Sequence, residues 1–274
     1  MKIEQHRLKD DSVEFQESPN HGGKLEAGEP DSIIIHYTAG GSLDGAVRTL
    51  TNPARKASAH LVIGRDGSIT QLVPFDTVAW HAGKSSYDGR SGFNKYSVGI
   101  ELDNAGRLTK SEGGYTSWFG RTYPGEEVLH ATHRNESQPA YWHTFTEMQI
   151  NLTFDLCELL IGAYPIESIM GHEEISPTRK SDPGPAFPLD KLRTRLLVRD
   201  RVDEGPDDAA PTSGKVGMVT ASRLNIRSAP GLGAERAGPP LPRGTMLDIL
   251  EESDGWLKVD VRSRGWVSRE YVAL

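Results

Sequence analysis

The sequence predicts an α/β domain with a mixed central sheet flanked by helices, followed by a small all-β domain at the C-terminus. Strand and helix patterns are interspersed through about the first 200 residues, and short alternating strands split by Gly and Pro turns fill the tail. Between them, residues 200–214 are acidic and rich in Pro, Ala, Gly and Ser, which is typical of a solvated linker. We therefore expect one domain over 1–199, with a core at 30–190, and a second over 215–274.

The strands of the first domain are predicted from apolar runs. DSIIIHYT (31–38) is β-branched, as expected for a strand buried on both faces. DGAVRTLTN (44–52) has helical spacing and stops before Pro53. HLVIGRDGSITQLVP (60–74) predicts two strands joined by a tight turn at its RDG segment, and YSVGIELD (96–103) predicts another strand.

The clearest helix is expected over TFTEMQINLTFDLCELLIGAY (144–164). Thr144 and Glu147 fit a capping box at its start. Its apolar stripe consists of Ile150, Phe154, Cys157 and Ile161.

Residues 105–143 interrupt the pattern of strands and helices. They contain several glycines and three histidines, and we expect a long, ordered surface insertion. Its Trp118 and Trp142 either stack on sugar rings or anchor the loop, and the sequence favours anchoring.

Composition excludes several classes of protein. The net charge is −7 and the pI about 5.7, with no basic stripe, so nucleic acid is not expected as a partner. The single cysteine, Cys157, excludes an intrachain disulfide and is expected in the core. The sequence contains no apolar run of about 18 residues, so no membrane span is expected. The start, MKIEQHRLKDDSVEF (1–15), has no signal-peptide pattern, so synthesis in the cytoplasm is expected.

Three polar residues form a candidate metal site. His36 ends a buried strand, where sheets commonly place ligands. His172 and Asp182 lie in the stiff segment GHEEISPTRKSDPGP (171–185), where Lys180 and Asp182 project to the same side if the chain is extended. Two imidazoles and a carboxylate suit zinc and leave a fourth position open. The alternative is a surface loop with an incidental salt bridge.

Glu101 is the candidate proton carrier. In SVGIELD (97–103) it lies on the face opposite Val98, Ile100 and Leu102. A carboxyl inside an apolar strand is costly unless it is paired or functional, and burial would raise its pKa toward a value useful for a base. A structural salt bridge with Arg or Lys is an equally good explanation from the strand alone. Lys180 is the candidate group for meeting a developing oxyanion.

Five blocks occur in order between about residues 30 and 190: IIIHYTAG (33–40), SAHLVIGRDGSITQLVP (58–74), AWHAG (79–83), NKYSVGIELDN (94–104) and GHEEISPTRKSDPGPAF (171–187). Together they resemble the type 2 zinc N-acetylmuramoyl-L-alanine amidases, relatives of phage T7 lysozyme and the peptidoglycan recognition proteins. The resemblance implies the amidase type 2 fold and hydrolysis of the amide between N-acetylmuramic acid and L-alanine in peptidoglycan or muropeptides.

The resemblance also implies roles for single residues. Zinc ligation falls to His36, His172 and Asp182, the general base to Glu101 and oxyanion stabilisation to Lys180. Substrate contacts are expected at Thr38, His60, Trp80, His81 and Ala82. For His60 a role in holding the sheet is the alternative, and for the segment Trp80–Ala82 it is structural packing. Some relatives have a Tyr before the His of the second block. Ala59 stands there in this chain, which adds weight to Glu101.

The tail resembles a bacterial SH3-like domain through VTASRLNIRSAPG (219–231), the Gly244-Thr245 turn and GWVSREYV (265–272). Binding to the cell wall is the expected role, and a structural or partner-binding appendage is the alternative. Candidate surface residues are Arg227, Trp256 and Trp266, of which Trp266 could equally lie in the core.

Two functional hypotheses follow. The first is a zinc amidase acting on peptidoglycan or its fragments. The second is a peptidoglycan-binding recognition protein with little or no turnover. The complete ligand set and the pair of Glu101 and Lys180 favour the enzyme. Access to the wall through holin-made holes, as in an endolysin, and recycling of muropeptides in the cytoplasm both fit a chain without a signal peptide.

Overall fold

The structure is a computed structural model, and it describes residues 1–26, 29–197, 215–218, 223–230, 234–238, 241–242, 245–253 and 256–261. The chain forms two compact units, Met1–Asp203 and Glu204–Leu274. The linker expected at 200–214 lies outside the described residues. The domain limits therefore remain a prediction.

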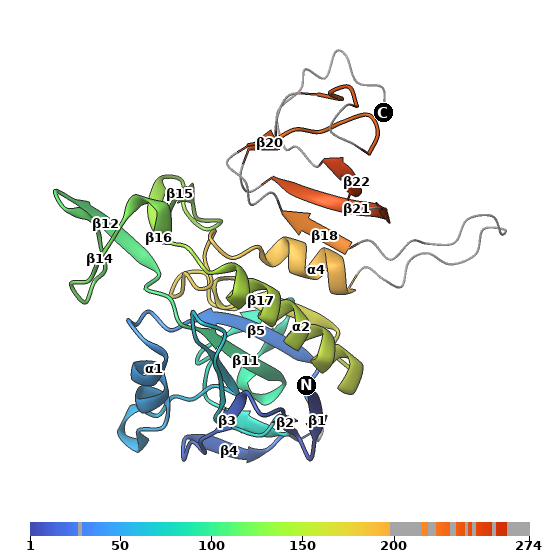
Figure 1. The fold of residues 1–274 in the computed structure, drawn as a ribbon. Helices are drawn as coiled ribbons and strands as arrows, with labels where there is room; N and C mark the ends of the chain where they lie inside the picture. The colour runs from blue at the N-terminus through green and yellow to red at the C-terminus, as the bar shows by residue number, and fades with distance from the viewer. Residues whose placement is uncertain are drawn as a thin grey trace. The chain divides into compact units, whose positions relative to one another are not determined.

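The first unit is built on a six-stranded mixed sheet (Figure 1). The first four strands in spatial order are mutually parallel, the fifth is antiparallel to the fourth, and the sixth is parallel to the fifth. In that order they are β17 (Ser168–Gly171), β5 (Ser32–Tyr37), β11 (Ser97–Leu102), β6 (Leu61–Ile63), β7 (Ile69–Gln71) and β3 (Val13–Phe15). The mixed central sheet expected from the sequence is confirmed.

Helices cover both faces of this sheet. On one face, α2 (Glu147–Ala163) and α4 (Leu189–Leu197) pack against Ile33 and Ile35. On the other, α1 (Leu43–Leu50) packs against Val62. Side chains alternate along a strand, so residues next to each other on β5 pack on opposite faces of the sheet. The short helices are α3 (His172–Ile175), η1 (Pro53–Arg55), η2 (Phe93–Lys95) and η3 (Gly125–Glu127).

The start of α2 differs from the prediction. The N-cap is Thr146, which forms a capping box with Gln149 instead of Thr144 with Glu147. Thr144 stays outside the helix because its carbonyl accepts hydrogen bonds from Arg65 and Asn104.

The buried face of α2 is wider than the expected stripe. Phe154 and Cys157 are buried as predicted, whereas Ile150 and Ile161 are only partly buried. The other buried members of the face are Gln149, Thr153, Leu156 and Leu160. Cys157 is a core residue, and burial raises the pKa of its thiol.

The insertion forms a sheet of its own. Its five antiparallel strands, in spatial order, are β14 (Thr122–Tyr123), β13 (Gly114–Thr116), β12 (Arg107–Ser111), β16 (Pro139–His143) and β15 (Val128–Thr132). Trp142 is 1% exposed and donates a hydrogen bond to the carbonyl of Ala131, so it anchors this sheet. Trp118 is 78% exposed and lies in the turn between β13 and β14.

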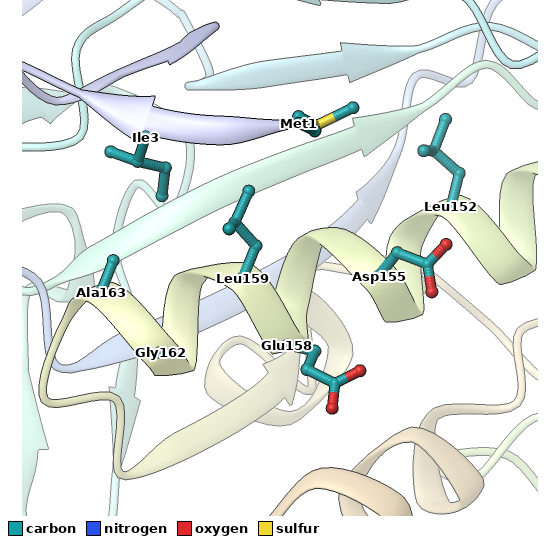
Figure 2. A pocket seen from close by; sticks show the side chains of 8 residues that line it. All are labelled: Met1, Ile3, Leu152, Asp155, Glu158, Leu159, Gly162 and Ala163. Atoms are coloured by element: carbon teal, nitrogen blue, oxygen red, sulfur yellow. The ribbon is translucent and has the colours of Figure 1, made fainter. Parts of the chain in front are cut away.

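Three short strand pairs complete the first unit: β1 (Lys2–Glu4) with β2 (Arg7–Lys9), β4 (His21–Lys24) with β8 (Thr77–Ala79), and β9 (Ser86–Tyr87) with β10 (Arg90–Ser91). A groove of about 670 Å³ runs between β1 and α2, with Met1 and Ile3 facing Leu152 and Leu159 across it (Figure 2).

The second unit contains short antiparallel strands in its described part. They are β18 (Lys215–Met218), β21 (Met246–Ser253) and β22 (Trp256–Val261) in one sheet, and β19 (Arg223–Leu224) with β20 (Leu241–Pro242) in a pair. Trp256 is half-buried, and Arg227 donates a hydrogen bond to the carbonyl of Ala234. Trp266 lies outside the described residues.

Within the described segments, none of the helices combines the length and apolarity that crossing a bilayer demands.

Replacing Leu160 with Ala should destabilise the first unit by about 3 kcal/mol, because its side chain is fully buried between α2 and the sheet. The free energy of unfolding, measured with urea, checks this. Leu159→Ala is the matched control, since Leu159 is only partly buried and should cost clearly less. Equal losses for the two variants would contradict the packing described here.

Candidate metal and active site

The site forms where three parallel strands end side by side. In the register of β5 with β11, His36 lies opposite Glu101. In the register of β17 with β5, Gly171 lies opposite Ile35, so His172 follows one position beyond. Residues opposite each other on neighbouring strands point to the same face. The parallel pairing therefore brings together groups that are 65 to 136 residues apart in the sequence.

Three ligand atoms converge at this edge of the sheet. Nδ1 of His36 lies 2.9 Å from Nδ1 of His172 and 2.8 Å from Oδ2 of Asp182, and the latter two atoms are 2.9 Å apart. All three side chains are buried. Asp182 arrives from the loop after α3, and its carbonyl accepts a hydrogen bond from the amide of Glu173. The three residues are placed to hold one metal ion.

The other ring nitrogens show which tautomers this cluster uses. Nε2 of His172 lies 3.0 Å from the carbonyl of Ala82, to which it donates. Nε2 of His36 lies 2.9 Å from Nδ1 of His81, whose own Nε2 lies 3.4 Å from the carbonyl of Ser97. Each of these two series of hydrogen bonds ends on a carbonyl oxygen, which can only accept. The rings of His36, His81 and His172 therefore donate through Nε2. The Nδ1 lone pairs of both ligand histidines are then directed at the common point, as metal binding requires.

The protonation states also suit a cation. Burial, reinforced by the neighbouring His172, lowers the pKa of His36 to about 4, despite the opposing effect of Asp182. Burial alone would raise the pKa of Asp182, but the close contacts of its carboxylate with the rings of His172 and His36 hold it well below its ordinary value. Near neutral pH the cluster therefore offers neutral His36 and an ionised carboxylate, the forms in which these groups bind a metal.

Glu101 lies beside this cluster without a partner. Its Oε2 is buried, and it is the one buried side-chain oxygen or nitrogen in the described part of the chain that makes no hydrogen bond. The residue as a whole keeps some exposed surface, because it borders a pocket of about 440 Å³. Burial raises the pKa of Glu101 to about 8, and the charge of Asp182 adds to the rise. The salt bridge considered from the sequence is not formed among the described residues.

Lys180 lies close enough to act on the same groups. Its positive charge lowers the pKa of Glu101 and that of His36. Its backbone amide donates to the carbonyl of Ser176, which helps to hold the loop before Asp182. Lys180 is half-buried.

The expected substrate contacts are only partly placed for that role. Thr38 lines the pocket at Glu101, and Trp80 is half-buried. His60 and Ala82 have no exposed surface, so the substrate contact expected for them does not fit. His60 instead holds the sheet, because it accepts from the amide of Gly99 and bonds the carbonyl of Thr77. His81 is 9% exposed and orients His36.

Several residues of the site were not identified from the sequence. Oδ1 of Asn94 accepts hydrogen bonds from the amides of His81 and Ala82. Buried Glu173 accepts from His133 of the insertion and from the amide of Gly184. Asn94 lies in a recognisable block, but no sequence signal pairs His133 with Glu173 across 40 residues.

Residues 26–185 match the family model described as N-acetylmuramoyl-L-alanine amidase, which is more than half of the chain. The chain belongs to this amidase family. Residues 222–273 match a bacterial SH3 domain. The resemblances seen in the sequence are thereby confirmed, and with them the expectation of an amide hydrolase of the muramoyl-alanine class. Members of the family are typically zinc-dependent, in keeping with the His36–His172–Asp182 cluster.

Curated relatives agree with the family. The chain is 31% identical over 200 residues to the 1,6-anhydro-N-acetylmuramyl-L-alanine amidase AmpD of Enterobacter cloacae, covering 66% of this chain and 88% of that protein. It is 32% identical over 169 residues to the N-acetylmuramoyl-L-alanine amidase AmiD of Escherichia coli strain K12, covering 58% and 51% respectively.

A solved structure supports the fold. The crystal structure of a Se-Met AmpD derivative superposes with a TM-score of 0.50 at 27% identity, covering 72% of this chain and 99% of that one. The amidase-type α/β fold expected from the sequence is confirmed.

Replacing Gly99 with Ala should destabilise the protein by about 1–3 kcal/mol, because a Cβ there would lie 2.4 Å from Cγ of the buried His81 ring. Urea unfolding measures the change. Gly162→Ala on α2 is the control, since a Cβ there meets nothing within 4 Å, and Ala favours a helix. A Gly99→Ala variant as stable as the wild type would show that the ring is free to move.

Replacing Glu101 with Gln should stabilise the metal-free protein increasingly as pH rises. The pKa of Glu101 is raised from 4.5 to about 8, so the folded state binds this proton more tightly than the unfolded state. Ionising the carboxyl therefore costs the wild type stability between these pH values. The measurement is the difference in unfolding free energy between variant and wild type at pH 4 and pH 8, in chelator. A difference independent of pH would contradict the burial of Glu101.

Proposed function

We propose that this chain catalyses zinc-dependent hydrolysis of the amide between the lactyl group of N-acetylmuramic acid and L-alanine. The observation that carries the proposal is the buried His36–His172–Asp182 cluster next to the unpartnered carboxyl of Glu101, in a chain of the amidase family. The arrangement combines a metal-binding set with a base that has no structural partner among the described residues.

The residues present fit a zinc ion. The two Nδ1 atoms and the carboxylate Oδ2 converge, and the opposite ring nitrogens are tied to His81 and to the carbonyl of Ala82. A zinc ion held there would act as a Lewis acid on the scissile carbonyl and make a bound water more acidic. The ligand set is complete without any group from another chain.

Glu101 would move the proton. Its oxygen takes a proton from the attacking water as the water oxygen bonds to the carbonyl carbon, and the same proton passes to the nitrogen of L-alanine as the carbon–nitrogen bond breaks. A carboxyl whose pKa is raised to about 8 suits both steps, since it holds and releases a proton near neutral pH. The missing hydrogen-bond partner leaves its Oε2 free to receive the proton.

Lys180 would stabilise the oxygen of the scissile carbonyl as negative charge develops on it. The influence of its ammonium charge on both Glu101 and His36 supports a position near the base and the metal ligands. A fixed positive charge in a partly buried site is well suited to stabilise an oxyanion.

The alternative is a recognition protein that binds peptidoglycan with little turnover. A binding protein has no need of an unpaired buried carboxyl, which costs stability. The unpartnered Oε2 of Glu101 therefore favours the enzyme.

The substrate class follows from the relatives and from the tail. The name of the Enterobacter relative specifies a 1,6-anhydro-muramyl peptide, which supports soluble muropeptides as substrates. The bacterial SH3 match over 222–273 supports attachment to the wall. We propose that the first unit cleaves muramoyl peptides and that the second holds the enzyme on peptidoglycan. The place of action, wall or cytoplasm, and the exclusion of nucleic acid as a partner remain predictions.

Incubating the zinc-loaded chain with peptidoglycan and with anhydromuramoyl tripeptide should release peptides that begin with L-alanine, as detected by mass spectrometry. A chelator should abolish release and added zinc should restore it. Glu101→Gln should lower kcat/KM by about a hundredfold or more, because it removes the base while keeping the shape. His36→Ala should also lose zinc, measured by metal analysis.

The matched control is His130→Ala, which changes a histidine of β15 that is exposed and outside the cluster. It should keep both zinc and activity. Tight binding to peptidoglycan without release of peptide from either substrate would refute the enzyme and leave the recognition protein.

A further inference from the structure

The pocket at Glu101 has a wall made by the insertion. Its volume is about 440 Å³, and it is bordered at one place by Glu101 and at another by Trp118 and Phe119, from the turn between β13 and β14. Thr38 and the residues after β5 also line it. The insertion therefore borders the same pocket as Glu101.

This turn is firmly docked on the loop that follows β5. The indole nitrogen of Trp118 donates to the carbonyl of Ala39 at 2.8 Å, and Arg121 donates to the carbonyl of Gly41 at 3.0 Å. The ring of Phe119 lies so close to Gly41 that a Cβ there would meet it at 3.1 Å. The indole of Trp118 is thus held in place although it is 78% exposed.

Besides its aromatic residues, the pocket is lined by several small residues. Gly45 and Ala46 of α1 and the Gly40-Gly41 segment present backbone and little side chain. The atoms nearest to a Cβ added to Gly40 would belong to Thr38, at 3.5 Å or more, which is ordinary van der Waals contact, so a side chain there would meet no clash. This pocket, called the slot below, combines two aromatic side chains with several small residues, which suits a flat, ring-shaped ligand.

The charges in the slot favour a sugar over a peptide. Arg55 is the one cation among the described residues that line it, and Glu101 is the one anion. A stem peptide carries several carboxylates and would need more cations. A pyranose ring is uncharged and offers C–H groups to an indole face, which is apolar with a negative quadrupole.

We propose that this slot binds the saccharide half of the substrate, with a pyranose ring stacked on Trp118. The inference rests on the proposed function, because it takes the lactyl amide to lie at Glu101 and the sugar to extend from there. It assigns a role to the insertion as a specificity element for the glycan.

The test uses the two halves of the proposed substrate as ligands of the zinc-loaded full chain, measured by NMR titration. They are N-acetylglucosaminyl-N-acetylmuramic acid and L-alanyl-D-glutamyl-L-lysine. Trp118→Ala should raise the dissociation constant of the saccharide about tenfold, the loss expected for one aromatic stacking contact. It should leave the dissociation constant of the peptide unchanged.

Three further variants separate stacking from folding of the turn. Trp118→Phe keeps an aromatic face without the hydrogen bond to Ala39, and should recover most of the saccharide affinity. Arg121→Ala removes a second tether of the same turn but no ring, and should keep the ratio of the two dissociation constants. Gly40→Val fills the slot and should weaken the saccharide again.

Other results overturn the inference. Loss of peptide affinity alone would place the peptide in the slot. An equal loss of affinity for both halves, or no change in either, would show that Trp118 has no saccharide contact. Failure of the saccharide to bind the wild type would show the same. Release of L-alanyl peptides by the wild type is scored separately, so a failure of the proposed function is recognised by itself.

Discussion

The parallel pairing of β17, β5 and β11 is the constraint on which the rest of the site depends. Because the three strands run in the same direction in a common register, their carboxyl ends meet, and His36, Glu101 and His172 lie on adjacent strands or one residue beyond them. A shift by one residue would turn His36 and Glu101 toward the opposite face, where the α2 core lies. The apolar core therefore holds the register, and the register holds the polar groups together.

Burial then determines the chemistry of these groups. Withdrawing two imidazoles and two carboxyls from water is costly, and the structure compensates for it unevenly. The carboxylate of Asp182 lies against the ring of His36, while His81 and the carbonyl of Ala82 orient the ligand rings. Glu101 alone keeps an unsatisfied buried oxygen. The cost of that oxygen is understandable if the carboxyl is needed for proton transfer, as in the proposed mechanism.

The insertion contributes to the site from two sides. At one end, His133 bonds Glu173, the residue next to His172, and thereby supports the loop that carries Asp182. At the other end, Trp118 and Phe119 form a wall of the pocket at Glu101. The five-stranded sheet between them gives the insertion a core of its own, with Trp142 buried. It is an ordered part of the catalytic unit, as its composition predicted.

The sequence by itself determined the α/β class, the strands at 31–38 and 96–103, and the candidate ligands. These features follow from local patterns, namely apolar runs, turn residues and short motifs, which need no knowledge of distant partners. Only the tertiary structure decided that His60 holds the sheet, that His81 orients His36, and that Trp118 borders the pocket while Trp142 is buried. Each of these outcomes depends on which segments, far apart in the chain, come into contact, because a side chain's exposure and hydrogen bonds are set by its neighbours in space.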